Sequence, residues 1–405
     1  MEILKLAAVL AVIVAVLWAK KPLWAGMLLA TLAMIPLFSL PLQTAGQALW
    51  TGAVGWQSIE ALLVLYAVTY LQRMMEERDN LKLCQQAMNG LFNNRRINAS
   101  LVPCLMGCLP AGSAVLICGP IVRESVGDAL AQDEQAALTS YFRHITESIL
   151  PTFTGVYIAI AATGGAVSAS TFVTWMLPMA AALFFAGWLV YLRRLPRDTG
   201  MVADQSRGTY WRLLGKSVWP VALAIALILL LHLPVELGVL AAIAVNIFVE
   251  RFTPRELTRF LTTAFEWKLM LSTWLIMIFK EVLSVTGVIE ALPSFFEALP
   301  IPTFLVFALI FFFGTIAAGN KAICALGVPL AMAAAGGRGQ LSLFVLLMCV
   351  CHAASQLSPT HVCLTICAED FHVSLGAMMR RSLPMVAVFL VMAFGYYFLL
   401  SVAGL

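Results

Sequence analysis

The sequence predicts an all-α polytopic membrane protein made of two inverted-topology repeats, and three observations support this class. Of the 405 residues, 61% are hydrophobic and only 11% are charged, against roughly 25% charged residues in a typical soluble domain. Apolar stretches near the length of about 20 residues that a spanning helix needs recur along the whole chain. Short motifs also recur in the two halves, as in repeat-built membrane folds.

The recurring motifs lie at a nearly constant shift along the chain. The segment 144–152 is matched by 352–360, with His, Pro and Thr at the same places and a shift of 208 residues (352 − 144). The segment 110–113 is matched by 317–320 at a shift of 207 residues (317 − 110). We therefore place a first repeat at 1–195, a cytoplasmic linker at 196–211 and a second repeat at 212–405.

Apolar periodicity divides each repeat into six elements. The first repeat is expected to hold elements at about 3–19, 23–42, 52–72, 98–128, 138–162 and 166–192. The second is expected to hold elements at about 212–232, 234–250, 266–289, 302–335, 341–368 and 378–403. The stretch 3–19 has the length of a signal peptide, but Glu2 and the Lys20-Lys21 pair favour a retained helix.

The fourth element of each repeat, at 98–128 and 302–335, is long and interrupted by Pro or Gly, which disfavour a continuous helix. Each is either a re-entrant hairpin or two short spans. Hairpins give each repeat five crossings, so the chain has about 10 transmembrane helices and the second repeat is inverted. This topology collects most Lys and Arg on one side, which the positive-inside rule makes cytoplasmic. The protein is then expected in the cytoplasmic (inner) membrane, with both termini on the side away from the cytoplasm.

Four non-helical breaks follow from this topology, two at hairpin tips and two inside the broken helices 138–162 and 341–368. Irregular backbone is tolerated within a membrane only where protein or a water-filled cavity satisfies it. Helix amino termini at such breaks attract anions, whereas carbonyl and hydroxyl oxygens can hold small cations. Plain proline kinks are the structural alternative. We expect the substrate to be bound by Gly112, Ser113, Thr152, Gly319, Asn320, Lys321, Ser358 and Thr360.

A second set of residues is expected to serve a coupling ion or proton. It comprises Pro110, His144, Glu147, Pro151, Pro359 and His361. Glu147 precedes Pro151 by one helical turn, next to the break. A buried carboxylate there could ligate Na⁺ or carry a proton, and a buried histidine could titrate near neutral pH. The alternative for Glu147 is an ion pair with Arg143 at the helix surface. Lys321 either faces the cavity or reaches the membrane surface.

Several classes of function are disfavoured. The basic residues form no water-facing stripe, so no nucleic-acid partner is expected. No zinc-protease helix, phosphate-binding loop or nucleophile elbow is recognisable, so we expect neither an enzyme nor a bound cofactor, apart from a possible Na⁺. Cys104/Cys108 and Cys363/Cys367 each share a helix face, but packing explains them better than a metal site.

The motifs Leu109–Ser113, Ala318–Asn320 and Ser358–Phe371 resemble those of the domain-of-unknown-function 401 integral membrane family. That family is similar to gluconate-type permeases and, more broadly, to the ion transporter superfamily. The resemblance covers essentially the whole chain. It implies inverted repeats with hairpins and broken helices, a homodimer and elevator-type alternating access. The tips read Gly112-Ser113-Ala114 and Gly319-Asn320-Lys321, unlike the Ser-Asn-Thr of the dicarboxylate branch.

From these features we expect a secondary active transporter in the lipid bilayer. It would move a small anion, most simply an organic acid, in symport with Na⁺ or H⁺. The rival hypotheses are a membrane scaffold or partner-binding protein without transport, and a carrier of a metal or lipid.

Overall fold

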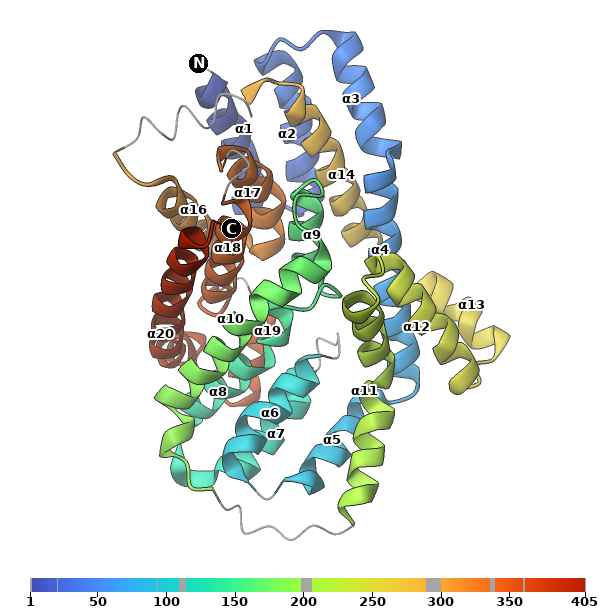
Figure 1. Ribbon diagram of the computed structural model, residues 1–405, viewed down its shortest axis with the longest axis vertical. Coiled ribbons are helices and arrows are strands. Elements are labelled where there is room, and N and C mark those ends of the chain that lie inside the picture. The colour runs from blue at the N-terminus through green and yellow to red at the C-terminus, as the bar shows by residue number, and fades with distance from the viewer. Residues whose placement is uncertain are drawn as a thin grey trace.

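The computed structural model describes residues 2–19, 21–92, 94–108, 114–197, 206–288, 300–335, 339–359 and 361–404. Every regular element in these ranges is a helix (Figure 1). The all-α class predicted from the sequence is therefore confirmed. Within the described ranges, four helical stretches are long and apolar enough to cross a membrane, and they are Leu42–Glu77, Ala169–Val190, Arg207–Leu230 and Leu375–Val402.

The helices form two groups that pack mainly within themselves. The first group, called the frame group here, contains α1 (Glu2–Trp18), α2 (Leu23–Leu37), α3 (Leu42–Val54), α4 (Trp56–Glu77), α5 (Asn80–Leu91), α11 (Arg207–Leu230), α12 (Val235–Val249), α13 (Pro254–Thr263) and α14 (Trp267–Ser284). Within it, α5 lies along α11, α12 along α4, and α14 along both α2 and α3.

The second group, called the site group here, contains all the interrupted helices. Its members are α6 (Arg95–Gly107), α7 (Ala114–Val126), η1 (Gly127–Ala129), α8 (Gln132–Arg143), η2 (Thr146–Ser148), α9 (Thr154–Ala162), α10 (Ala169–Val190), η3 (Leu192–Arg194), α16 (Thr303–Ala318), α17 (Asn320–Ala334), α18 (Gln340–Ser355), α19 (Val362–Asp370) and α20 (Leu375–Val402). The pair α6–α7 occupies the lower part of the molecule in Figure 1, and α16–α17 the upper part. The two pairs thus approach the middle from opposite ends.

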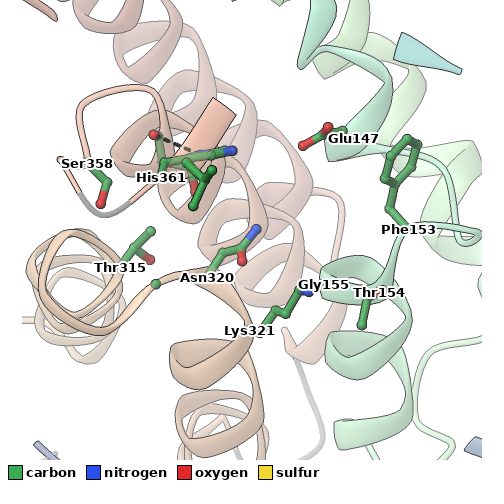
Figure 2. A pocket seen from close by; sticks show the side chains of 12 residues that line it. Glu147, Phe153, Thr154, Gly155, Thr315, Asn320, Lys321, Ser358 and His361 are labelled. Atoms are coloured by element: carbon green, nitrogen blue, oxygen red, sulfur yellow. Dashed lines mark hydrogen bonds between the residues drawn. The ribbon is translucent and has the colours of Figure 1, made fainter. Parts of the chain in front are cut away.

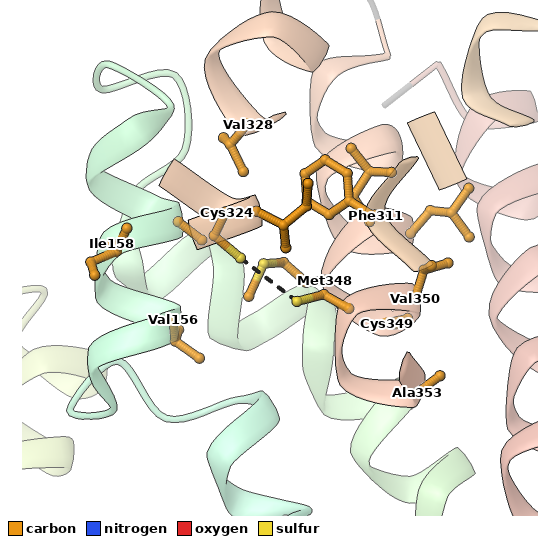
Figure 3. Packing of buried hydrophobic residues seen from close by; sticks show 14 of the residues in the cluster. Val156, Ile158, Phe311, Cys324, Val328, Met348, Cys349, Val350 and Ala353 are labelled. Carbon is orange, nitrogen blue, oxygen red and sulfur yellow. Dashed lines mark hydrogen bonds between the residues drawn. The ribbon is translucent and has the colours of Figure 1, made fainter. Parts of the chain in front are cut away.

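The interior of the site group is a continuous apolar core. Phe311 of α16, Cys324 of α17 and Cys349 of α18 are fully buried in it. Figure 3 shows these residues packed beside Val156 and Ile158 of α9. Because this core joins the hairpin α16–α17 to the broken helices, the polar ends of those helices are held at fixed positions.

Glycine allows two of the closest helix contacts. A Cβ atom on Gly52 of α3 would lie 2.6 Å from the Cα atom of Ile278 in α14. One on Gly107 of α6 would lie 2.1 Å from the carbonyl oxygen of Arg143 at the end of α8. Real Cβ contacts are not this short, so both helix pairs can approach this closely only because glycine has no side chain.

Four helices differ from the segments predicted from the sequence. The span expected at 52–72 is preceded by α3 (Leu42–Val54), and the sequence prediction did not include α5 or α13. Both α5 and α13 carry polar residues and are amphipathic. Apolar length does not predict them, because each helix buries only one side and carries polar residues on the other. The helix expected from 212 begins earlier, at Arg207.

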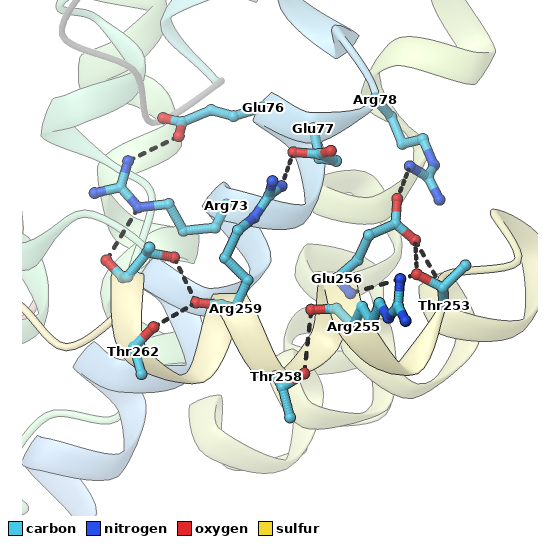
Figure 4. Close-up of polar contacts among 11 residues, drawn as sticks. Arg73, Glu76, Glu77, Arg78, Thr253, Arg255, Glu256, Thr258, Arg259 and Thr262 are labelled. Atoms are coloured by element: carbon cyan, nitrogen blue, oxygen red, sulfur yellow. Dashed lines mark hydrogen bonds and ion pairs between the residues drawn. The ribbon is translucent and has the colours of Figure 1, made fainter.

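Helix α13 is fixed to the end of α4 by charged side chains (Figure 4). Arg78 pairs with Glu256 at 2.7 Å, and Arg259 pairs with Glu77. Thr253 and Glu256 form a capping box at the start of α13, in which the Thr253 amide donates to Glu256 Oε2 at 2.6 Å. The hydrogen bond from Arg78 lowers the pKa of Glu256 to about 2, so this carboxylate is charged at neutral pH.

Candidate functional site

The first broken helix ends at Arg143 and resumes at Thr154. Between them lie η2 and Pro151, which cannot donate a backbone hydrogen bond. Hydroxyl groups satisfy the carbonyls freed by the break. Ser148 Oγ donates to the Ile145 carbonyl at 2.6 Å, and Thr146 Oγ1 donates to that of Arg143 at 3.4 Å. The break is therefore an ordered turn inside the protein.

The second broken helix ends at Ser355 and resumes at Val362, with Pro359 in between. Ser358 is buried, and its Oγ atom donates to the Ile316 carbonyl of α16 at 3.2 Å. This hydrogen bond ties the break to the hairpin α16–α17. The break after Ser355 and the turn between α16 and α17 are consequently held side by side.

The hairpin turn between α16 and α17 depends on Gly319. Its φ of 85° is a left-handed conformation that glycine adopts without strain. The next residue, Asn320, begins α17 and approaches α9 closely. A Cβ atom on Gly155 would lie 3.2 Å from Asn320 Nδ2. The starts of α9 and α17 are thus adjacent.

These interruptions enclose a cavity of about 390 Å³. It is lined by Glu147, Phe153, Thr154, Gly155, Thr315, Gly319, Asn320, Lys321, Ser355, Ser358, His361 and Val362. In Figure 2, α9 residues face Asn320 and Lys321 across the cavity, with Ser358 and His361 on the remaining side. We call this space the central cavity.

Three helix amino termini converge on the central cavity. They belong to α9, α17 and α19, and their N-cap residues are Phe153, Gly319 and His361. None of these three N-caps accepts a hydrogen bond through its side chain from its helix. The first amides of all three helices can therefore donate to a ligand, and each helix end carries a partial positive charge. Lys321, which also lines the cavity, adds the positive charge of its ammonium group.

The acidic side of the cavity is one buried ion pair. Arg143 Nη1 lies 2.7 Å from Glu147 Oε1, and the exposed fractions of the two side chains are 2% and 21%. Arg143 is thus enclosed, whereas Glu147 opens to the cavity. The pair anticipated from the sequence at a helix surface does exist, but it is buried because α6 and α18 cover this turn.

Two histidines adjoin this pair, with ring centroids 4.7 Å apart. Nδ1 of His144 lies 2.6 Å from the Ser140 carbonyl oxygen, and Nδ1 of His361 lies 3.3 Å from that of Ser355. Because a carbonyl oxygen only accepts, each Nδ1 atom carries a proton and donates. Nε2 of His144 accepts from Arg143 Nη1 at 3.2 Å. Both rings are therefore fixed in one orientation.

A metal ion fits this cluster poorly. Ligand atoms of His144, His361 and Cys363 lie within 4.8 Å of one another, and such nitrogen and sulfur atoms suit zinc. However, Arg143 Nη1 lies 3.2 Å from Nε2 of His144. A fixed guanidinium cation next to this lone pair opposes a second cation there.

The structure brings together part of the predicted site. Gly319, Asn320, Lys321, Ser358, Glu147 and His361 line the central cavity. His144 lies behind them, around a small adjoining space of about 30 Å³. Thr152, Pro151 and Pro359 are in the breaks but do not line the central cavity. Pro110, Gly112, Ser113 and Thr360 lie outside the described residues.

Sequence reasoning missed several lining residues, chiefly Phe153, Thr154, Gly155, Thr315 and Ser355. The first three lie at the start of the helix that follows Pro151, whereas the sequence motif predicted the proline itself. A useful signal was available, because the donors at a helix break belong to the next two or three residues. Thr315 and Ser355 carried no such signal.

The fold and cavity define a polytopic, all-helical membrane protein with a polar site at interrupted helices. Residues 3–400 match the family described as "Protein of unknown function (DUF401)", and the chain belongs to that family. The structure is similar to the crystal structure of the YdaH transporter of Alcanivorax borkumensis, with a TM-score of 0.66 and 14% identity over 94% of this chain and 98% of that one. The search of curated proteins found no match.

Proposed function

We propose that this protein is a secondary active transporter that binds a small organic anion in the central cavity. The main support is that three helix amino termini without side-chain caps converge, together with Lys321, on the central cavity of about 390 Å³. Such termini are natural anion sites. The volume is of the size that small-molecule sites have.

The charge of the cavity supports a monovalent substrate. Glu147 and Arg143 offset each other, so among the described lining residues and their ion-pair partners Lys321 supplies the one charge that no ion pair compensates. An anion with a single carboxylate balances it. Polar side chains such as Asn320 and Ser358 leave room for further hydrogen bonds to the substrate.

The division into two helix groups supports elevator-type alternating access. In this mechanism the site group would move past the frame group, and Na⁺ or H⁺ would drive the movement. A homodimer would hold the frame groups in the membrane. Basic residues gather near η3, where Arg96 donates to the backbone carbonyls of Leu195 and Arg193. By the positive-inside rule, this favours a cytoplasmic position for this end of the molecule and an external position for both termini.

The test is a melting-temperature screen of the purified protein against mono- and dicarboxylates. It is done in NaCl and in choline chloride, at two pH values. A ligand at 100 times its dissociation constant adds about 2.7 kcal/mol to the free energy of unfolding. Stabilisation by monocarboxylates supports the proposal, and a dependence on Na⁺ or on pH identifies the coupling ion. No stabilisation by any anion would favour a scaffold or a non-anionic substrate.

Variants then place the bound anion. We expect Lys321→Ala to weaken binding about 10- to 100-fold, because a hydrogen bond to a charged group contributes about 1.5–3 kcal/mol. Asn320→Ala should abolish uptake into proteoliposomes while the protein still folds. Lys216→Ala, at an exposed position of α11, is the matched control and should bind normally. Equal binding by Lys321→Ala and Lys216→Ala would contradict the site assignment.

A further inference from the structure

The small space of about 30 Å³ that adjoins the central cavity is a side pocket of the same site. Glu147, Asn320, Ser355 and His361 line both spaces. A water-sized group needs about 10–15 Å³ of such space. The side pocket therefore admits one small polar group, such as a hydroxyl or an amide nitrogen, from a ligand in the central cavity.

The hydroxyl groups that line the side pocket have no hydrogen left for a ligand. Ser148 Oγ donates to the Ile145 carbonyl at 2.6 Å, and Ser355 Oγ donates to the Cys351 carbonyl at 2.9 Å. A hydroxyl carries one hydrogen, and a carbonyl oxygen only accepts. Toward a ligand, both serine side chains can therefore only accept.

Nε2 of His361 and Oε2 of Glu147 are two further acceptors. Because Nδ1 of His361 donates to the Ser355 carbonyl, Nε2 of the neutral ring holds a lone pair, and it has no hydrogen-bond partner among the described residues. Glu147 pairs with Arg143 through Oε1, and its Oε2 atom lies 3.9 Å from Nε2 of His144, beyond hydrogen-bonding distance. Figure 2 shows the His361 ring and the Glu147 carboxylate turned toward one another.

A charged group fits these acceptors poorly. Arg143 Nη1 lies 2.7 Å from Glu147 Oε1 and 3.2 Å from His144 Nε2, so its guanidinium charge opposes another cation. A hard cation such as Na⁺ also prefers oxygen ligands to an imidazole nitrogen. An anionic group would meet the Glu147 carboxylate. A neutral hydrogen-bond donor avoids both conflicts.

We propose that the side pocket receives an N–H or O–H group of the substrate, which donates to His361 Nε2 and Glu147 Oε2. This inference rests on the transport function proposed above, in which the substrate carboxylate lies at the uncapped helix amino termini with Lys321. The substrate class is then a monocarboxylate with a neutral donor, a hydroxyl or a primary amide, away from its carboxylate. Glu147 and His361, expected from the sequence to serve a coupling ion or proton, become substrate ligands.

The experiment is isothermal titration calorimetry of the full-length protein in detergent with matched pairs of monocarboxylates. 4-Hydroxybutyrate is compared with pentanoate, and succinamate with monomethyl succinate, because the second member of each pair lacks the donor at a similar size. Shorter and longer homologues of each pair are included. A buried acceptor left without a donor costs free energy, so the donor-bearing member should bind at least about 5-fold more tightly.

The outcomes separate this inference from the proposed function. Tighter binding of the hydroxyl or of the amide member identifies which donor the side pocket takes. Equal binding within every pair would overturn the side-pocket assignment and leave the anion hypothesis intact. Binding of no monocarboxylate at all would overturn the anion hypothesis, and this inference with it.

Two substitutions of His361 separate its acceptor from its structural role. The amide nitrogen of His361→Asn can replace Nδ1 toward the Ser355 carbonyl but leaves no acceptor at the position of Nε2, so the preference within each pair should disappear. His361→Gln can place its amide oxygen there and should retain the preference. His372→Asn, at an exposed position, is the matched control. An unchanged preference in His361→Asn would overturn the assignment, and the wild-type comparison remains decisive if a variant does not fold.

Discussion

The two broken helices share a motif but differ in charge. With the shift of 208 residues, Arg143 and Glu147 of the first break correspond to Cys351 and Ser355 of the second (351 − 143 and 355 − 147). The first break holds a buried ion pair, whereas Cys351 lies in an uncharged contact, 3.8 Å from Cys324 between sulfur atoms.

The two hairpins also differ in charge, but here the charged residue belongs to the second repeat. Lys321 of the second hairpin corresponds to Ala114 of the first, at a shift of 207 residues (321 − 114). The repeat thus supplies paired interruptions, and single substitutions make their charges unequal.

The largest expected effect is loss of one partner of the buried pair. Glu147→Gln removes the carboxylate that pairs with the enclosed Arg143, and breaking a buried pair costs about 3–5 kcal/mol. Arg143→Met should cost less, because Glu147 opens to the central cavity. Chemical denaturation in detergent measures both.

The double variant Arg143→Cys, Glu147→Ser gives the first break the residues of the second. We expect it to lose less stability than the single variants Arg143→Cys and Glu147→Ser summed, since neither charge of the pair remains. Additive losses would show that the ion pair contributes no coupling and would weaken the charge comparison.

An intermediate effect is expected at a matched pair of glycines. Gly107 and Gly314 correspond at the shift of 207 residues (314 − 107). A Cβ atom on Gly107 would meet the Arg143 carbonyl oxygen at 2.1 Å, whereas one on Gly314 would meet the end of the Ile323 side chain at 2.6 Å. Gly107→Ala should therefore cost about 1–3 kcal/mol.

Gly314→Ala is the internal control, and it should cost clearly less because a side-chain end moves more easily than backbone. The same denaturation assay compares the two. A larger loss for Gly314→Ala would contradict the packing described for the first break.

The smallest expected effect lies outside the membrane, at the ion pair of Arg78 and Glu256. The pKa of Glu256 in the folded protein, about 2, is below its usual value of 4.5. The pair therefore stabilises the fold fully above pH 4.5, and this contribution is lost as the pH falls toward 2. Arg78→Ala should lower the melting temperature slightly at neutral pH and not at all near pH 2.

Arg255→Ala, at an exposed position of the same helix, controls for general loss of positive charge. A difference between wild type and Arg78→Ala that stays constant down to pH 2 would show that Arg78 acts through another contact. Its guanidinium group also lies 3.9 Å from the ring of Phe252, which is the obvious candidate.

Much of the fold was predictable from the sequence because a membrane imposes local rules. Apolar length marks a span such as α20, and Gly319 marks the turn between α16 and α17 without knowledge of neighbours. The amphipathic helices α5 and α13 were not predictable in this way, because their stability depends on packing against α11 and α4. The candidate site divides similarly, with Asn320 found from its motif and Thr315 found only in the structure.

The sequence by itself determined the class of protein, the paired interruptions and the residues at their centres, because backbone breaks in a membrane follow from Pro and Gly locally. Only the tertiary structure decided which charges meet. It buried Arg143 against Glu147 and turned Lys321 into the central cavity. Electrostatic pairing depends on distances between helices, and the sequence of one helix does not contain those distances.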